Sequence, residues 1–209
     1  RKAFVLVSMM SVILGLSGCS QNQDFVYHRS VAELNQKAAT MMNTGDYAGA
    51  VARLEAAHDL MPKEGSILFN LAIAYRENRQ LTKAETSFKD FIQQHKDHAK
   101  YGDALLSLAI VLEDQADKTL AELTKKDTSG ESRPKTLSTT GELDLNPSPE
   151  QLQADCERYY SEAIKAYEIY LKSPQKQPAQ VEQVEAHITT LKKSLALVEK
   201  GQFDEMPLF

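Results

Sequence analysis

Hydrophobic residues recur every three or four positions along most of the chain after residue 30, and polar residues fill the positions between them. The same stretches are rich in Ala, Leu, Glu, Lys and Gln, which favour helices, whereas clusters of β-branched and aromatic residues between turn signals are almost absent. The pattern therefore predicts an all-α protein in which each helix buries one face.

Two successive segments, 31–64 and 65–98, carry the same pattern with an offset of 34 residues. In both segments small alanines alternate with larger apolar residues, which lets two paired helices approach closely. Inside the first segment, Gly45 suits a left-handed helix end and Asp46 suits the start of the next helix. Each segment is therefore predicted to be a pair of helices. The aligned positions are Leu34 with Leu68, Ala38 with Ala72, Ala50 with Ala84, and Leu54 with Phe88.

The two segments resemble tetratricopeptide repeats, whose pattern is Trp-x2-Leu-Gly-x2-Tyr, then Ala-x3-Phe, then Pro. The second segment reads Leu68-x2-Leu71-Ala72-x2-Tyr75 and then Ala84-x3-Phe88. Both segments lack the Trp, the first has Lys37 in place of Leu, and the second lacks the closing Pro. The resemblance implies a solenoid of helical hairpins, of about three repeats, that binds another protein or a peptide.

A third repeat, over about 99–175, is interrupted in its middle. Its first helix carries Leu105-x2-Leu108-Ala109-x2-Leu112 and continues to about residue 125, while Ser148 and Pro149 start the second helix well before its Ala163-x3-Tyr167 motif. We therefore expect an extended antiparallel hairpin with a mobile insertion, 127–148, rich in Ser, Thr, Gly and Pro. Across this hairpin, Leu120 and Leu123 are expected to face Leu152, Cys156 and Tyr159.

The last predicted helix, 178–200, begins at Pro178 and is stopped by Gly201, which opens the tail 201–209. Its apolar residues step alternately by three and four positions, as in the seam of a coiled coil. Two interpretations stay open: a capping helix that covers the end of the solenoid, or a coiled-coil or dimer contact. The seam residues are Val181, Val184, Ile188, Leu191, Leu195 and Val198.

The first residues have the pattern of an export signal. Arg1 and Lys2 precede an apolar run, 3–16, that is shorter than the about 20 residues needed to span a bilayer. The following Leu16-Ser17-Gly18-Cys19 resembles the lipobox of bacterial lipoproteins. The resemblance implies that 1–18 is removed and that acylated Cys19 anchors the chain; an uncleaved anchor helix is the alternative. By the same resemblance, Ser20 is compatible with the periplasmic face of the outer membrane.

The segment 19–29 is interpreted as a short lipidated tether. Ser30 and Glu33 have the spacing of a capping box and predict that the first helix of the repeats begins at Ser30, so the predicted repeat domain runs over 30–200. If Cys19 is acylated, Cys156 has no partner for a disulfide. Its place in a helical pattern then favours a small buried apolar side chain.

Charge and motifs argue against several function classes. The net charge is −5 and no basic stripe is present, which disfavours nucleic-acid binding. His95 and His98 are two histidines without the third or fourth ligand that a zinc site needs. The sequence also lacks a phosphate-binding loop, a Gly-x-Ser-x-Gly elbow and a His-Glu-x-x-His motif. We therefore predict a protein that is not an enzyme and uses no cofactor or metal.

The resemblance also implies a binding surface, because the first helix of each tetratricopeptide hairpin lines the concave face. The implied surface is largely apolar and lacks the Lys, Asn and Arg set that grips a terminal carboxylate in some family members. It suits an amphipathic helix or another hydrophobic segment. Alternatively, the C-terminal helix or the tether fills it, or Phe69 and Ile73 are ordinary core. The implied groove residues are Asn35, Ala39, Met42, Phe69, Ile73, Arg76, Leu106 and Ile110, with Glu113 on the next turn.

Together these patterns predict a lipid-anchored scaffold or adaptor of the bacterial cell envelope. Its partner would be a protein or peptide in the assembly of envelope, pilus or outer-membrane complexes, or in the control of peptidoglycan enzymes. The alternative is a structural homo-oligomer that assembles through the C-terminal helix and the extended hairpin and has no separate client.

Overall fold

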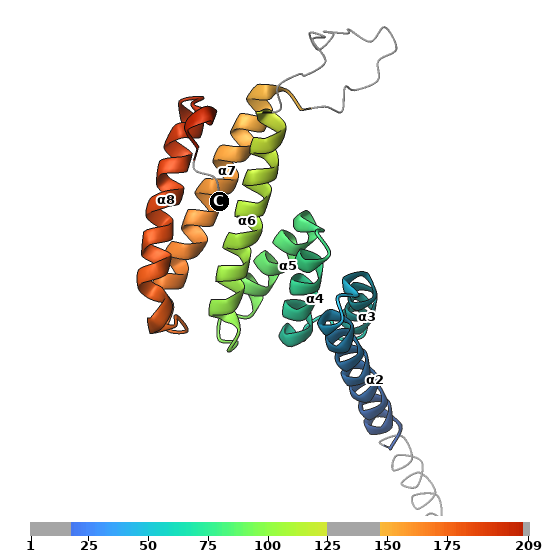
Figure 1. Ribbon diagram of the computed structural model, residues 1–209. Helices are drawn as coiled ribbons and strands as arrows, with labels where there is room; N and C mark the ends of the chain where they lie inside the picture. The colour runs from blue at the N-terminus through green and yellow to red at the C-terminus, as the bar shows by residue number, and fades with distance from the viewer. Residues whose placement is uncertain (1–17, 125–146, 207–209) are drawn as a thin grey trace, which may run out of the picture. The chain divides into compact units, whose positions relative to one another are not determined.

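The computed structural model describes residues 18–124 and 147–206, and within these ranges every regular element is a helix (Figure 1). The predicted signal segment up to residue 17, nearly all of the predicted insertion and the last three residues lie outside the described residues. The chain divides at Asn78 into two compact units, each of which has its own packing. No helix in the described ranges is both long and apolar enough to cross a membrane.

Unit 1 contains α2 (Gly18–Asn43), α3 (Tyr47–Leu60) and α4 (Gly65–Glu77), and α3 packs against both of its neighbours. The turn into α3 is the one that the sequence predicts. Gly45 has a φ of +81°, and the side chain of Asp46 accepts a hydrogen bond of 2.9 Å from the backbone N–H of Gly49. The hydroxyl of Tyr75 in α4 donates to Glu55 in α3 at 2.7 Å, which ties the two helices together. The buried core includes Ala38, Ala50, Leu54, Ala57, Leu68, Leu71 and Ala72.

The first helix starts earlier than the capping box predicts. α2 begins at Gly18, so Ser30 lies inside the helix and does not cap it. The segment 20–29 holds neither Gly nor Pro, and no residue in it therefore breaks the helical backbone. Glu33 forms an ion pair of 3.2 Å with Arg29, one turn before it, instead of reaching back to Ser30. The expected tether is thus a continuation of the first helix.

Unit 2 contains α5 (Leu81–Gln94), α6 (Tyr101–Leu123), α7 (Pro149–Lys172) and α8 (Val181–Glu199), with short 3-10 turns at Pro178–Gln180 and Phe203–Glu205. The helices α6 and α7 form the long antiparallel hairpin that the sequence predicts (Figure 1). The α7 helix starts as expected, with Ser148 accepting from the backbone N–H of Gln151 at 3.2 Å and Pro149 in the first turn.

The buried residues of α7 along the hairpin recur every four positions. Tyr160 therefore occupies the place at which the sequence predicts Tyr159. Leu152, Cys156 and Tyr160 are buried along the hairpin, whereas Tyr159 points away and lies under the guanidinium of Arg158, 4.1 Å from the ring centre. The hydroxyl of Tyr160 donates to Asp117 at 3.0 Å. Burial of Cys156, as predicted, raises the pKa of its thiol to about 12, so at neutral pH it is a small apolar side chain and not a nucleophile.

The apolar seam of α8 is used inside unit 2. Val184, Ile188, Leu191 and Val198 are buried, and α8 packs along α7. The helix ends at Gly201, which has a φ of +68°, as the sequence predicts. This arrangement agrees with the capping-helix interpretation, and it leaves the coiled-coil alternative without a free seam in the described part of the chain.

Candidate functional site

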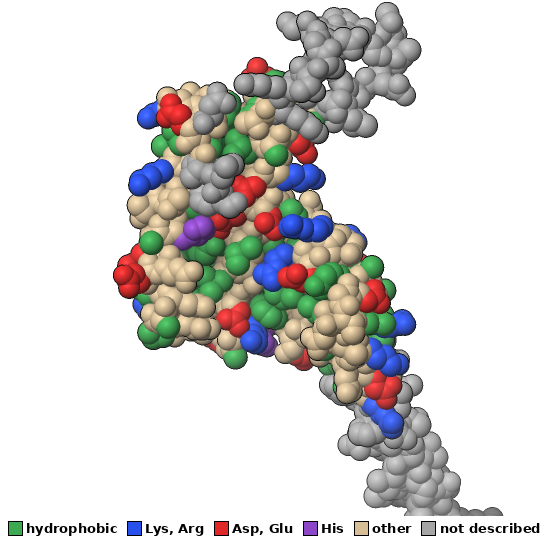
Figure 2. Space-filling view, in the orientation of Figure 1, with side chains coloured by type: hydrophobic (Ala, Val, Ile, Leu, Met, Phe, Trp, Pro, Cys, Tyr) green, Lys and Arg blue, Asp and Glu red, His purple; other side chains and the backbone are tan. Residues whose placement is uncertain are grey.

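A hollow of about 480 Å³ opens between α6 and α8, and we call it the α6–α8 groove. Two of the predicted groove residues, Leu106 and Ile110, form its α6 wall, and 43% of the Ile110 surface is exposed. The capping helix forms the other wall, so it borders the groove and does not fill it. Figure 2 shows hydrophobic side chains gathered over this part of unit 2, beside a histidine. The remaining lining residues are Tyr167, Gln180, Gln183, Val184, Ala186, His187 and Thr190.

Three helices are held together beside this groove by one carboxylate. Glu113 of α6 accepts a hydrogen bond of 2.6 Å from the hydroxyl of Tyr167 in α7, and its other oxygen lies 2.7 Å from Nε2 of His187 in α8. Burial, and then the nearby charge of Glu113, raise the pKa of Tyr167, so its hydroxyl stays protonated and donates. The network fixes both walls of the groove, and a partner would therefore meet an ordered surface.

The predicted groove residues of unit 1 occupy several environments. Asn35 accepts a hydrogen bond of 2.9 Å from the side-chain amide of Asn70, and Arg76 pairs with the adjacent Glu77 at 2.6 Å. Phe69 keeps only 9% of its surface exposed, which agrees with the alternative that its ring is ordinary core. Of the others, Ala39 is exposed, while Met42 and Ile73 are half-buried.

The α8 side of the groove was missed by the sequence reasoning. The sequence predicts Val184 only as a seam residue, and His187 belongs to no recognisable motif. The apolar spacing of α8 could have indicated this wall. An amphipathic helix that ends a repeat array lies where the first helix of a following hairpin would lie. With α8 in that place, its polar side is predicted to line the groove.

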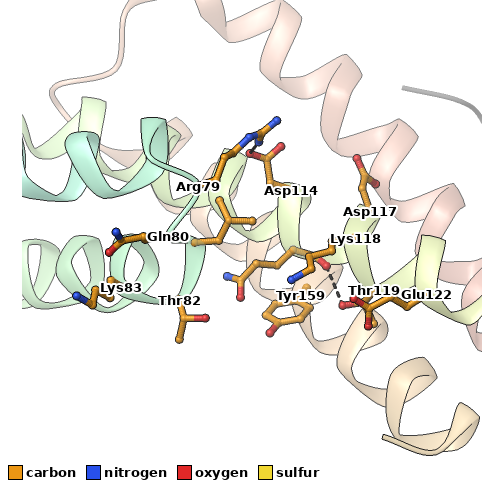
Figure 3. Close-up of a pocket in the computed structure, with 12 residues that line it drawn as sticks. Arg79, Gln80, Thr82, Lys83, Asp114, Asp117, Lys118, Thr119, Glu122 and Tyr159 are labelled. Atoms are coloured by element: carbon orange, nitrogen blue, oxygen red, sulfur yellow. Dashed lines mark hydrogen bonds and ion pairs between the residues drawn. The ribbon is translucent and has the colours of Figure 1, made fainter. Parts of the chain in front are cut away.

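A second and more polar hollow, of about 930 Å³, lies where α6 extends past the start of α5. Figure 3 shows Arg79 reaching Asp114, at 3.1 Å, on one side of this hollow and Tyr159 on the other. Both signs of charge line it, with Lys118 and Asp117 on the same helix. We therefore do not assign it a ligand of one charge type.

The turn beside this polar hollow contains a non-glycine residue in a backbone conformation that such residues rarely adopt. Arg79 and Gln80 align with Gly45 and Asp46 of the preceding repeat, 34 residues earlier. Arg79 has a φ of 59°, in the left-handed region that favours glycine, and it is the only such non-glycine residue in the described ranges. Gln80 does not cap α5, and its Oε1 is buried with no hydrogen-bond partner among the described residues.

We predict that restoring the turn chemistry of the first repeat stabilises the protein. Arg79→Gly should raise the free energy of unfolding by about 0.5–1 kcal/mol by relieving the left-handed strain, because the lost ion pair is exposed and weak. Gln80→Asp should add about 1 kcal/mol by capping α5. Urea denaturation measures both effects. The reciprocal Gly45→Arg should destabilise by a similar amount, and a stabilising result there would contradict the explanation.

The two histidines that the sequence brings together lie beside one aromatic side chain. The rings of His95 and His98 each lie 5.2 Å from the ring of Phe91, measured between centroids, so they pack against an aromatic core residue. In the part of the chain that the structure describes, no three side chains of the His, Cys, Asp or Glu type gather where they could hold an ion.

Comparison with known families assigns the repeats. Residues 42–109 match the family described as tetratricopeptide repeat. The match covers 68 of the 209 residues, so this segment is similar to tetratricopeptide repeats. A solved structure of similar fold is the tetratricopeptide domain of Sgt2 from Aspergillus fumigatus, with a TM-score of 0.48, 17% sequence identity and 86% of each chain covered. No curated protein matches the chain. The described helices and the family match give an all-α fold class with tetratricopeptide-type hairpins. Proteins of this repeat family bind protein or peptide partners and are typically non-catalytic.

Proposed function

We propose that the protein is a non-enzymatic adaptor that binds a hydrophobic or amphipathic segment of another protein in the α6–α8 groove. The observation that carries this proposal is the exposure of Ile110, an isoleucine with 43% of its surface in contact with solvent inside a hollow. An aliphatic side chain left in a concave and ordered surface is typical of an interaction site. The Glu113 network supports the proposal because it ties α6, α7 and α8 together beside the groove.

The finer part of the proposal concerns location. Leu16-Ser17-Gly18-Cys19 after the apolar run 3–16 supports a lipoprotein anchored through Cys19 in the bacterial cell envelope, and Ser20 favours the outer membrane. Because α2 begins at Gly18, the anchor would join the repeats through a helix and not through a flexible tether. The segment from Cys19 to Arg29 would then span roughly 15 Å at the rise of an α-helix.

A structural homo-oligomer is the weaker alternative. It depended on a free apolar seam along the last helix, and four of the six seam residues are buried within unit 2. The adaptor role needs no second copy of the chain. Its clients would belong to the envelope pathways named above, namely assembly of surface complexes or control of peptidoglycan enzymes.

We test the adaptor role with substitutions in the groove. A pull-down from detergent-solubilised envelopes with mass spectrometry identifies the partner, and calorimetry then measures its affinity for purified variants. Leu106→Ala and Ile110→Ala should each weaken binding by about 1–2 kcal/mol, because they remove anchors that a partner buries. Leu60→Ala is the matched control, since this leucine is similarly exposed, at 41%, and lines none of the hollows described for unit 2. Unchanged affinity in both groove variants would contradict the proposal.

A further inference from the structure

A second apolar hollow, of about 370 Å³, lies on the side of unit 2 formed by α5 and α7, and we call it the α5–α7 groove. Its floor is α6, whose Leu108 and Leu112 are buried beneath it. Ile169 of α7 lies on its wall with 46% of its surface exposed, more than Ile110 at 43% and Leu60 at 41%. The two most exposed isoleucines of unit 2, Ile110 and Ile169, thus line different grooves that share α6.

The rim of this groove carries an excess of positive charge. Lys89 lies between Glu85 and Glu162, with nitrogen–oxygen distances of 2.7 Å and 2.6 Å. These two carboxylates neutralise the positive charge of Lys89. Burial alone would lower the pKa of Lys89, but its hydrogen bonds to these carboxylates outweigh that effect and raise it. Lys96 and Lys165 are exposed on the same rim, and neither forms an ion pair with any described residue.

This surplus is a local exception in an acidic protein. The whole chain has a net charge of −5, yet the border of one apolar hollow offers two ammonium groups that pair with none of the described residues. A segment that places an aliphatic side chain against Ile169 and carboxylates beside Lys96 and Lys165 would match the groove in both shape and charge. A flat anionic membrane would match the lysines but could not fill the concave floor.

We propose that the α5–α7 groove is a second docking surface that takes an acidic amphipathic segment of a partner protein. The aliphatic side chains of that segment enter the hollow, and its carboxylates lie against Lys96 and Lys165. This goes beyond the proposed function, because it gives unit 2 two binding faces and lets one adaptor join two clients. The two grooves differ in chemistry: the first has a carboxylate network beside it, and the second has a cationic rim.

The test uses photo-cross-linking in the full-length chain in its own cells, with p-benzoylphenylalanine in place of Ile169. We expect the captured tryptic peptide to contain Asp or Glu beside aliphatic residues. The yield should fall about fivefold in the Lys96→Glu, Lys165→Glu double variant, as expected for the loss of two exposed ion pairs. Lys193→Glu with Lys200→Glu makes the same charge change on two exposed lysines, one in α8 and one directly after it, and should leave the yield unchanged.

Four results would overturn the proposal: capture of a basic or uncharged peptide, capture of a phospholipid, a yield that the two double variants change equally, or the absence of any adduct. Because the substituted lysines are exposed, thermal melting should be the same for both double variants, which separates lost binding from lost folding. The same probe in place of Ile110 reports on the α6–α8 groove, so the adaptor role can fail or hold independently of this inference.

Discussion

Leu54→Ala should lower the free energy of unfolding by about 2–5 kcal/mol, whereas Leu60→Ala on the same helix should lower it by less than about 1 kcal/mol. Both substitutions remove the same atoms from α3. Leu54 has 1% of its surface exposed in the core of unit 1, and Leu60 has 41% exposed. Truncation of Leu54 leaves a cavity that its neighbours cannot close fully, and truncation of Leu60 leaves only solvent.

Urea denaturation followed by circular dichroism measures this difference. Since the chain forms two compact units, the Leu54 variant should shift the transition of unit 1, and a separate transition of unit 2 should keep its midpoint. Equal losses from the two leucines would mean that the packing of α3 differs from the arrangement described above. The comparison is informative because residue type, helix and size of the deletion are all held constant.

Cys19→Ala is expected to have the largest effect on location. Without the thiol no acyl chain can be attached, so the variant should lose labelling by an alkyne fatty acid and accumulate as unprocessed precursor. Ser20→Asp keeps the thiol and is the matched control, which should still be labelled. Membrane fractionation with in-gel fluorescence measures both variants. Persistent labelling of the Cys19 variant would contradict acylation at this cysteine.

Local sequence signals predicted the elements of the repeats well. Gly45 with Asp46, and Ser148 with Pro149, mark helix boundaries because each acts on backbone groups a few residues away. The extended hairpin of α6 and α7 could also be predicted, since apolar periodicity continues on both of its helices. Capping signals failed at Ser30, where a favourable local motif lies within a segment that nothing interrupts.

The candidate site was less accessible from sequence. Leu106 and Ile110 could be placed in a groove because their repeat position fixes the face on which they lie. Glu113 and His187 are 74 residues apart, and no local pattern indicates that they meet. Phe69 shows a second limit of prediction from sequence. The same repeat position can be accessible in one hairpin and buried in another.

The sharing of α6 by two grooves has a consequence for genetics. Substitutions at Leu106 and Ile110 should form one phenotypic class, in which the protein accumulates normally and loses a client. Substitutions at the interleaved buried positions should form another, in which abundance falls because folding is impaired. A screen that groups alleles by their order along the chain would mix the two classes. Grouping them by helical face would separate them, with Leu105, Leu108 and Leu112 on the buried side.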